Sequence, residues 1–202
     1  MEVRDGGKLR ACCASIAAAA FTLGPALARA GDEAPNVRLT HNTQRFAVAR
    51  ALGGALQRLD RPECQALLDE FADAAGAPLR VSLEATGLSA PDYLKRVFFY
   101  DGSPRLCGPS GLAVTTPGSR AVFVCGSRFV REMSSNRRHA EATILHEMLH
   151  SLGLGENPPS SDHIQTRVLA RCGEREDAKN AARIPPVRPA RAGAKAVASE
   201  RP

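Results

Sequence analysis

The chain has 202 residues, enough for one domain, and a formal net charge of +6 that lies mostly at its two ends. Residues 1–30 hold four basic and two acidic side chains, and the residues after Gly173 hold seven basic and four acidic ones. The middle of the chain is therefore nearly neutral, which argues against a nucleic-acid-binding surface. The absence of Trp argues against a sugar-binding platform of aromatic rings.

The first thirty residues have the pattern of a secretory signal peptide. Lys8 and Arg10 precede an apolar run over 11–23, and an A-x-A cleavage site follows from Ala28 to Ala30. The run is shorter than the about 20 residues that a membrane span needs. We predict cleavage after Ala30 and a secreted or periplasmic protein without a stable membrane span. An uncleaved anchor is the alternative.

The rest of the chain divides into a folded part and a tail. After residue 30, nearly all of the large apolar side chains lie within residues 31–173, whereas residues 174–202 consist mainly of Ala, Pro and Arg. We therefore predict a signal peptide over 1–30, one domain over 31–173 and a disordered basic tail over 174–202.

Four cysteines remain after removal of the signal peptide, and an even number in an exported chain favours two disulfides. The pairing that we predict joins Cys107 to Cys125 across a hairpin region and Cys64 to Cys172 between helices. Free buried thiols are the alternative. A zinc site made of all four cysteines is disfavoured, because no C-x-x-C spacing occurs among them.

The first half of the domain reads as helical. Apolar residues recur at intervals of three and four, and the pair Gly53 and Gly54 is expected to contact a neighbouring helix. Residues 79–83 alternate briefly, which predicts a strand or an extended linker. We predict a first helix that is capped by Thr40 or Asn42 and runs to Leu59, and further helices over 62–75 and 89–97.

The second half contains the only clear strand pattern. Residues 112–116 and 121–125 flank a Pro-Gly turn and predict a β-hairpin, which we place beside the helix that follows; a purely structural hairpin is the alternative. Residues 126–138 read as a polar loop. Helices are predicted over 139–152, largely buried, and from Ser160 or Ser161 to Cys172. The fold class is therefore α+β and mostly helical, with a small hairpin or sheet beside the buried helix.

The motif of the chain lies on that buried helix, where residues 146–150 read HEMLH and match the pattern HExxH. Positions four apart share one face of a helix, so His146 and His150 can bind one metal ion, zinc being the usual one. Glu147 then lies beside the ion as a candidate general base. The alternative is a pair of histidines that hydrogen-bond within the core.

The third metal ligand is open among several residues. Glu156 lies six positions after the second histidine, and His163 begins the next helix and can fold back toward the ion. Glu174 and Asp162 are the weaker candidates. If Glu156 binds the metal, His163 becomes a candidate for stabilising the oxyanion of the reaction, as does Arg167.

The stretch from His146 to Glu156 resembles the metzincin motif HExxHxxGxxH, with Gly153 at the turn and Glu156 in place of the third histidine. It departs from that family in this carboxylate and in having no methionine after His150 for a Met-turn. Residues 40–172 also resemble a group of small exported bacterial proteins described as zinc metallopeptidases. The resemblance implies a zincin-like peptidase fold, zinc and secretion.

The function predicted from the sequence is that of a secreted, monomeric zinc metalloendopeptidase that acts on a peptide or protein substrate. Glu147 would serve as general base on a zinc-activated water. A secreted non-catalytic zinc-binding or interaction module is the main alternative. A disulfide-linked helical protein without metal is a third possibility.

Overall fold

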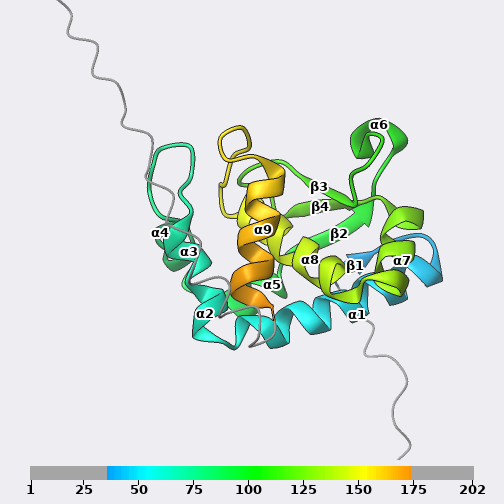
Figure 1. The fold of residues 1–202 in the computed structure, drawn as a ribbon, viewed down its shortest axis with the longest axis horizontal. Coiled ribbons are helices and arrows are strands. Elements are labelled where there is room, and N and C mark those ends of the chain that lie inside the picture. Colours follow the sequence, from blue (N-terminus) through cyan, green and yellow to red (C-terminus); the bar gives the residue numbers. More distant parts are fainter. Residues whose placement is uncertain (1–35, 174–202) are drawn as a thin grey trace, which may run out of the picture. The chain divides into compact units, whose positions relative to one another are not determined.

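The computed structural model describes residues 36–173, which form a mostly helical α+β fold around a small sheet (Figure 1). The fold class predicted from the sequence is confirmed. The signal peptide predicted over 1–30 and the tail predicted over 174–202 lie outside the described residues, and both stay predictions. Within residues 36–173 no helix combines the length and the apolar character needed to cross a membrane.

Helices make up most of the described chain, and the sheet has four short strands. The helices within residues 36–173 are α1 (Asn42–Leu59), α2 (Pro62–Gln65), α3 (Leu67–Glu70), α4 (Leu79–Glu84), α5 (Ala90–Leu94), α6 (Pro104–Cys107), α7 (Gly126–Ser135), α8 (Arg137–Ser151) and α9 (Ser161–Cys172). The strands are β1 (Val37–Arg38), β2 (Phe98–Asp101), β3 (Ala113–Thr115) and β4 (Ala121–Val124).

Serine caps begin two of the predicted helices where the sequence placed them. The side chain of Ser89 accepts a hydrogen bond from the N–H of Asp92 at the start of α5. Ser160 accepts one from the N–H of His163 at the start of α9. Each cap satisfies a backbone donor that the first turn of a helix leaves unpaired. The first predicted helix is confirmed as α1, but neither Thr40 nor Asn42 caps it, because the N-cap residue is His41 and no side chain accepts a cap hydrogen bond there. The helix predicted to carry the two histidines is α8.

The sheet has the strand order β1-β2-β4-β3, with β1, β2 and β4 parallel and β3 antiparallel to β4 at one edge. The predicted hairpin is therefore confirmed as β3 and β4. Strands β1 and β2 are not foreseen by the sequence pattern. In β2 aromatic residues occupy both faces, because Phe99 is buried against the helices while Phe98 and Tyr100 stack outside with ring centroids 6.4 Å apart. Such a strand shows no alternation of apolar and polar residues.

Two segments fold differently from the sequence prediction. The strand or linker predicted over 79–83 is wrong, since α4 forms there and buries Leu79 and Leu83 on one side. The loop predicted over 126–138 is also wrong, because α7 occupies most of it. Phe129 and Met133, four residues apart, bury one face of α7 against the core, and its polar residues form the outer face.

The helix predicted over 62–75 is shorter and interrupted. It consists of α2 and α3, and the backbone is extended at Phe71. The chain then turns back, since the Asp73 carboxylate accepts hydrogen bonds from the N–H groups of Ala75 and Ala77. An aspartate that binds the backbone two and four residues ahead favours a turn over a helix.

Both predicted disulfides are present. Cys64 in α2 is bonded to Cys172 at the end of α9, and Cys107 at the end of α6 is bonded to Cys125 after β4. The first bridge spans 108 residues of sequence and ties α9 to the beginning of the domain.

Helix α8 is the central element of the fold, and every residue from 140 to 151 is buried. It packs against α1, α7, α9 and the hairpin strands, so neighbours surround it (Figure 1). The turn between β3 and β4 is joined to its end, because the N–H of Gly118 donates to the carbonyl oxygen of His150 at 2.9 Å. The sequence prediction that this helix is largely buried is confirmed.

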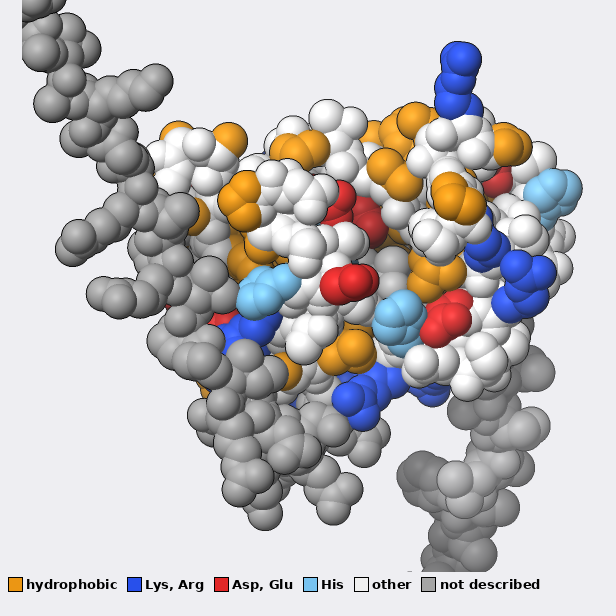
Figure 2. Space-filling model, turned by 45° about the horizontal axis from the view of Figure 1, so that its top comes forward, with side chains coloured by type: hydrophobic (Ala, Val, Ile, Leu, Met, Phe, Trp, Pro, Cys, Tyr) orange, Lys and Arg blue, Asp and Glu red, His pale blue; other side chains and the backbone are white. Residues whose placement is uncertain are grey.

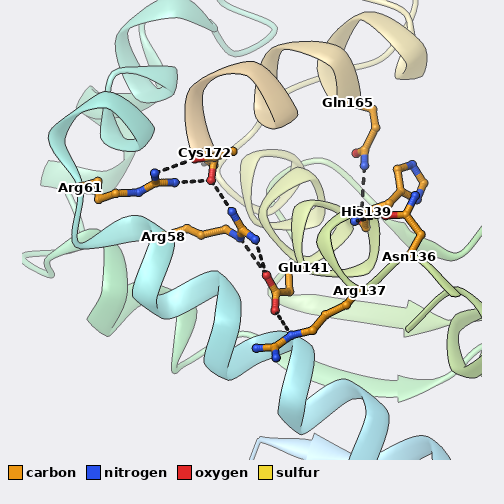
Figure 3. A network of polar contacts seen from close by, with 9 residues as sticks. Arg58, Arg61, Asn136, Arg137, His139, Glu141, Gln165 and Cys172 are labelled. Atoms are coloured by element: carbon orange, nitrogen blue, oxygen red, sulfur yellow. Dashed lines mark hydrogen bonds and ion pairs between the residues drawn. The ribbon is translucent and has the colours of Figure 1, made fainter. Parts of the chain in front are cut away.

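Helices α1 and α8 approach each other at Gly54, where the Glu141 side chain lies over the glycine. Figure 3 shows Glu141 between Arg58 and Arg137. Glu141 is buried and paired on both oxygens, with Arg58 at 2.6 Å and Arg137 at 2.6 Å. Arg58 also donates to the carbonyl oxygen of Cys172 at 2.6 Å, which joins the end of α9 to the same group. The expected helix contact of the glycine pair is therefore made by Gly54, whereas Gly53 faces open space.

The two adjacent glycines make a matched test of this contact. A Cβ at position 54 would lie 2.1 Å from Oε1 of Glu141 and would displace a carboxylate held by two arginines. We expect Gly54→Ala to lower the free energy of unfolding by at least about 2 kcal/mol. Gly53→Ala should raise it, by up to about 1 kcal/mol, because alanine is the better helix former. Urea unfolding of both variants measures the difference, and equal effects would contradict the packing at Gly54.

Candidate metal centre

His146 and His150 lie one turn apart on the buried face of α8, and their Nε2 atoms are 3.0 Å from each other. Each residue is about 95% shielded from solvent, with exposed fractions of 5% and 4%. The positions follow from the helical repeat, which places residues four apart on one face.

The second ring nitrogen of each histidine is held by an acceptor. Nδ1 of His150 lies 2.7 Å from the carbonyl oxygen of Leu154, and Nδ1 of His146 lies 3.1 Å from Oε1 of Gln165 on α9. A carbonyl oxygen only accepts, so the proton of each neutral ring is on Nδ1. Both Nε2 atoms then carry lone pairs that point toward each other.

Two lone pairs at 3.0 Å repel unless a cation or a proton lies between them. Burial, followed by the proximity of His150, lowers the pKa of His146 to about 4, so at neutral pH this ring is uncharged. Nδ1 on a hydrogen-bond acceptor and Nε2 toward a shared point is the usual arrangement of histidines that bind metal. The donor set of this structure therefore fits a metal ion.

Glu156 completes the group. Helix α8 ends at Ser151, and Gly153 follows with a φ of +112° that turns the chain back over the histidines. Oε1 of Glu156 then lies 3.7 Å from Nε2 of His146 and 3.5 Å from Nε2 of His150. These three residues form a group that can hold a metal ion, and their atoms lie within 4.8 Å of one another. The two Nε2 atoms and Oε1 of Glu156 are separated by 3.0, 3.5 and 3.7 Å, so the point equidistant from all three lies about 2.0 Å from each. This distance matches metal bonds of ~2.0–2.2 Å to imidazole and carboxylate.

Glu147 is also buried, with 4% of its surface exposed, and its Oε2 has no hydrogen-bond partner among the described residues. Burial raises the pKa of Glu147 to about 7, and the Glu156 carboxylate contributes in the same direction. The Thr115 hydroxyl at the end of β3 lowers the pKa of Glu147. Its contact with the Glu147 carboxyl group lies outside the geometry of a full hydrogen bond, so Oγ1 of Thr115 stays unpaired. A carboxylate that titrates near neutral pH suits a general base.

The other predicted candidates lie apart from this group. The His163 ring packs edge-on against Phe71 with centroids 6.3 Å apart, and its Nε2 is buried without a hydrogen-bond partner among the described residues. Arg167 is buried and paired with Glu70. Asp162 is exposed in the first turn of α9 and is not part of the metal group found among residues 36–173.

Glu174 lies outside the described residues. The assignment of an oxyanion role to His163 stays a prediction. Figure 2 shows one face of the molecule, on which histidine and acidic side chains reach the surface between apolar ones.

Gln165 and Thr115 were not foreseen as part of the site. Gln165 lies nineteen residues after His146, and only the packing of α9 on α8 brings the two together. No motif marks such a residue. Thr115 lies in β3 of the predicted hairpin. The sequence placed this hairpin beside α8, and that placement is the one prediction that brings Thr115 near the site.

Comparison of the chain with family models, with curated proteins and with solved structures gave no match. The evidence for a function therefore comes from the geometry of this site.

The third ligand can be tested with two variants. Glu156→Ala removes a carboxylate from the metal group and should weaken Zn²⁺ binding at least about tenfold. His163→Ala alters a ring that packs on Phe71 and should leave Zn²⁺ affinity unchanged. Competition with a chromogenic chelator measures both affinities. The opposite pattern, loss with His163→Ala and none with Glu156→Ala, would assign the third ligand to His163.

The protonation of Glu147 predicts a pH dependence of stability in the metal-free protein. Its pKa is raised from 4.5 to about 7 on folding, so its contribution to stability is complete below pH 4.5 and is lost as the pH rises through 7. The Glu147→Gln variant cannot titrate there. Between pH 5 and pH 8 the wild type should lose about 2 kcal/mol relative to Glu147→Gln. Urea unfolding of both proteins with EDTA at pH 5 and pH 8 measures their free energies of unfolding. A difference between the wild type and Glu147→Gln that does not change with pH would contradict the raised pKa of Glu147.

Proposed function

We propose that this chain is a zinc-dependent metallopeptidase of the HExxH zincin class, secreted as a monomer. The observation that carries the proposal is the buried Glu147 carboxyl group, whose Oε2 has no hydrogen-bond partner among the described residues, beside a group of three side chains that can hold a metal ion. An unpaired carboxylate oxygen in a buried position is costly, and a function that uses it explains its retention.

Zinc is the metal that the donor set favours. Two imidazoles and one carboxylate are a common ligand set of catalytic zinc, which keeps a further position open for water or substrate. Three ligands come together among the described residues, and His163 is not one of them. A non-catalytic zinc module would be favoured by a closed shell of four ligands, so this arrangement supports the catalytic proposal.

The chain's own groups divide the chemistry between them. When bound, zinc supplies Lewis acidity that acidifies water and polarises a carbonyl group. Glu147 accepts the proton of the attacking water at its unpaired oxygen and later gives it to the leaving amine. The Nδ1 hydrogen bonds of His146 and His150 keep their Nε2 atoms available as metal ligands.

The hairpin offers a place for an extended peptide. Strand β3 is the last strand in the sheet order and pairs only with β4 among the described strands, so its other edge has unpaired backbone groups. Because β3 packs against α8 and ends at Thr115, a peptide added along this edge would pass beside Glu147. A peptide or protein is therefore the substrate that we propose.

The two disulfides support a location outside the reducing cytosol. Together with the signal peptide predicted over residues 1–30, they favour a secreted or periplasmic enzyme.

Substitution of the proposed base separates metal binding from catalysis. Glu147→Gln keeps the shape of the side chain but cannot accept the proton, so it should lower peptide hydrolysis at least about 100-fold while retaining Zn²⁺. Glu63→Gln, an exposed glutamate on α2, is the control. The assay measures new amino termini released from unfolded protein substrates, beside the zinc content of each variant.

An active Glu147→Gln variant would disprove this role of Glu147. A wild type that binds zinc and hydrolyses no peptide would favour the non-catalytic zinc-binding module.

A further inference from the structure

Gln165 belongs to α9, and its side chain contacts two residues of α8, His146 and His139. Its Oε1 is 3.1 Å from Nδ1 of His146, and its Nε2 donates to the backbone carbonyl oxygen of His139 at 3.5 Å. Figure 3 shows the side chain reaching from α9 toward the His139 backbone at the beginning of α8.

The carbonyl oxygen of His139 decides the orientation of this amide. A backbone carbonyl only accepts hydrogen bonds, so it selects the NH₂ end of Gln165 and turns Oε1 toward His146. Oε1 in turn only accepts, so Nδ1 of His146 must carry the proton. The lone pair of His146 is then on Nε2, on the side of His150 and Glu156.

The two histidines of the candidate metal centre differ in the group that accepts the hydrogen bond from Nδ1. His150 donates to the backbone of Leu154, within the turn that ends α8, so no side-chain substitution removes its partner. His146 depends on a side chain from another helix. That helix, α9, packs on α8, and the Cys64–Cys172 disulfide fixes its end to α2.

We infer that Gln165 is a positioning residue of the metal centre, which holds the His146 ring in the orientation and tautomer that bind a divalent metal. The inference rests on the metal-binding part of the proposed function. Outer partners of this kind typically change metal affinity by 10–100-fold.

The test compares Zn²⁺ affinities of the full-length protein by competition with a chelator. Gln165→Met has a similar length but no acceptor, and we expect its affinity to fall about 10–100-fold. Gln165→Glu keeps an acceptor for Nδ1 of His146 but loses the donor to His139, so it should bind Zn²⁺ more tightly than Gln165→Met does. Gln57→Leu, a loss of an exposed glutamine from α1, should leave the affinity unchanged.

The visible spectrum of the Co²⁺-loaded protein adds a readout that a loss of packing alone would not change. It should shift in Gln165→Met and return toward the wild type in Gln165→Glu. Gln165→Ala, judged folded by circular dichroism, replaces Gln165→Met if the latter does not fold.

The outcomes separate this inference from the proposed function. If Gln165→Met binds Zn²⁺ as tightly as the wild type, the role of Gln165 is overturned and the metallopeptidase proposal stays intact. Equal losses in Gln165→Met and Gln165→Glu would also overturn it, since the acceptor would then not matter. A wild type that binds neither Zn²⁺ nor Co²⁺ would overturn both.

Discussion

The burial of α8 on all sides is the constraint on which the rest of the structure depends. A helix surrounded by other elements normally contains apolar residues alone, because each buried polar group costs free energy unless it is paired. Helix α8 instead carries two glutamates and two histidines within its buried stretch. The surrounding elements must therefore provide polar partners for these four side chains.

The two ends of α8 meet this need in different ways. At its beginning, Glu141 is paired by Arg58 and Arg137, and the small Gly54 makes room for it, so the polar group joins helices α1, α8 and α9. This pairing is complete and structural. At the other end, each histidine has an acceptor at Nδ1 and turns Nε2 toward the other histidine and Glu156, and Glu147 keeps one oxygen free. This incomplete pairing lies at the end of the helix that we propose to be functional.

The functional end also shows why separate elements are needed for one site. The helical repeat supplies His146, Glu147 and His150, and the turn at Gly153 brings Glu156 back over them. Helix α9 contributes Gln165, and the edge strand β3 contributes Thr115. The disulfide between Cys64 and Cys172 and the hydrogen bond from Gly118 to His150 attach those two outer elements to the body of the fold.

Local pattern was sufficient for the helices α1, α8 and α9, the hairpin and the two histidines, because each follows from a repeat, a cap or a spacing. It failed at α4, whose brief alternation favours a strand, at α7, whose polar residues favour a loop, and at β2, which is apolar on both faces. The sequence by itself determined which helix carries the two histidines of the candidate metal centre. Only the tertiary structure decided that Glu156 faces this pair and His163 does not, and that Gln165 holds His146. These contacts join separate elements of the fold, and their geometry depends on packing that no local spacing encodes.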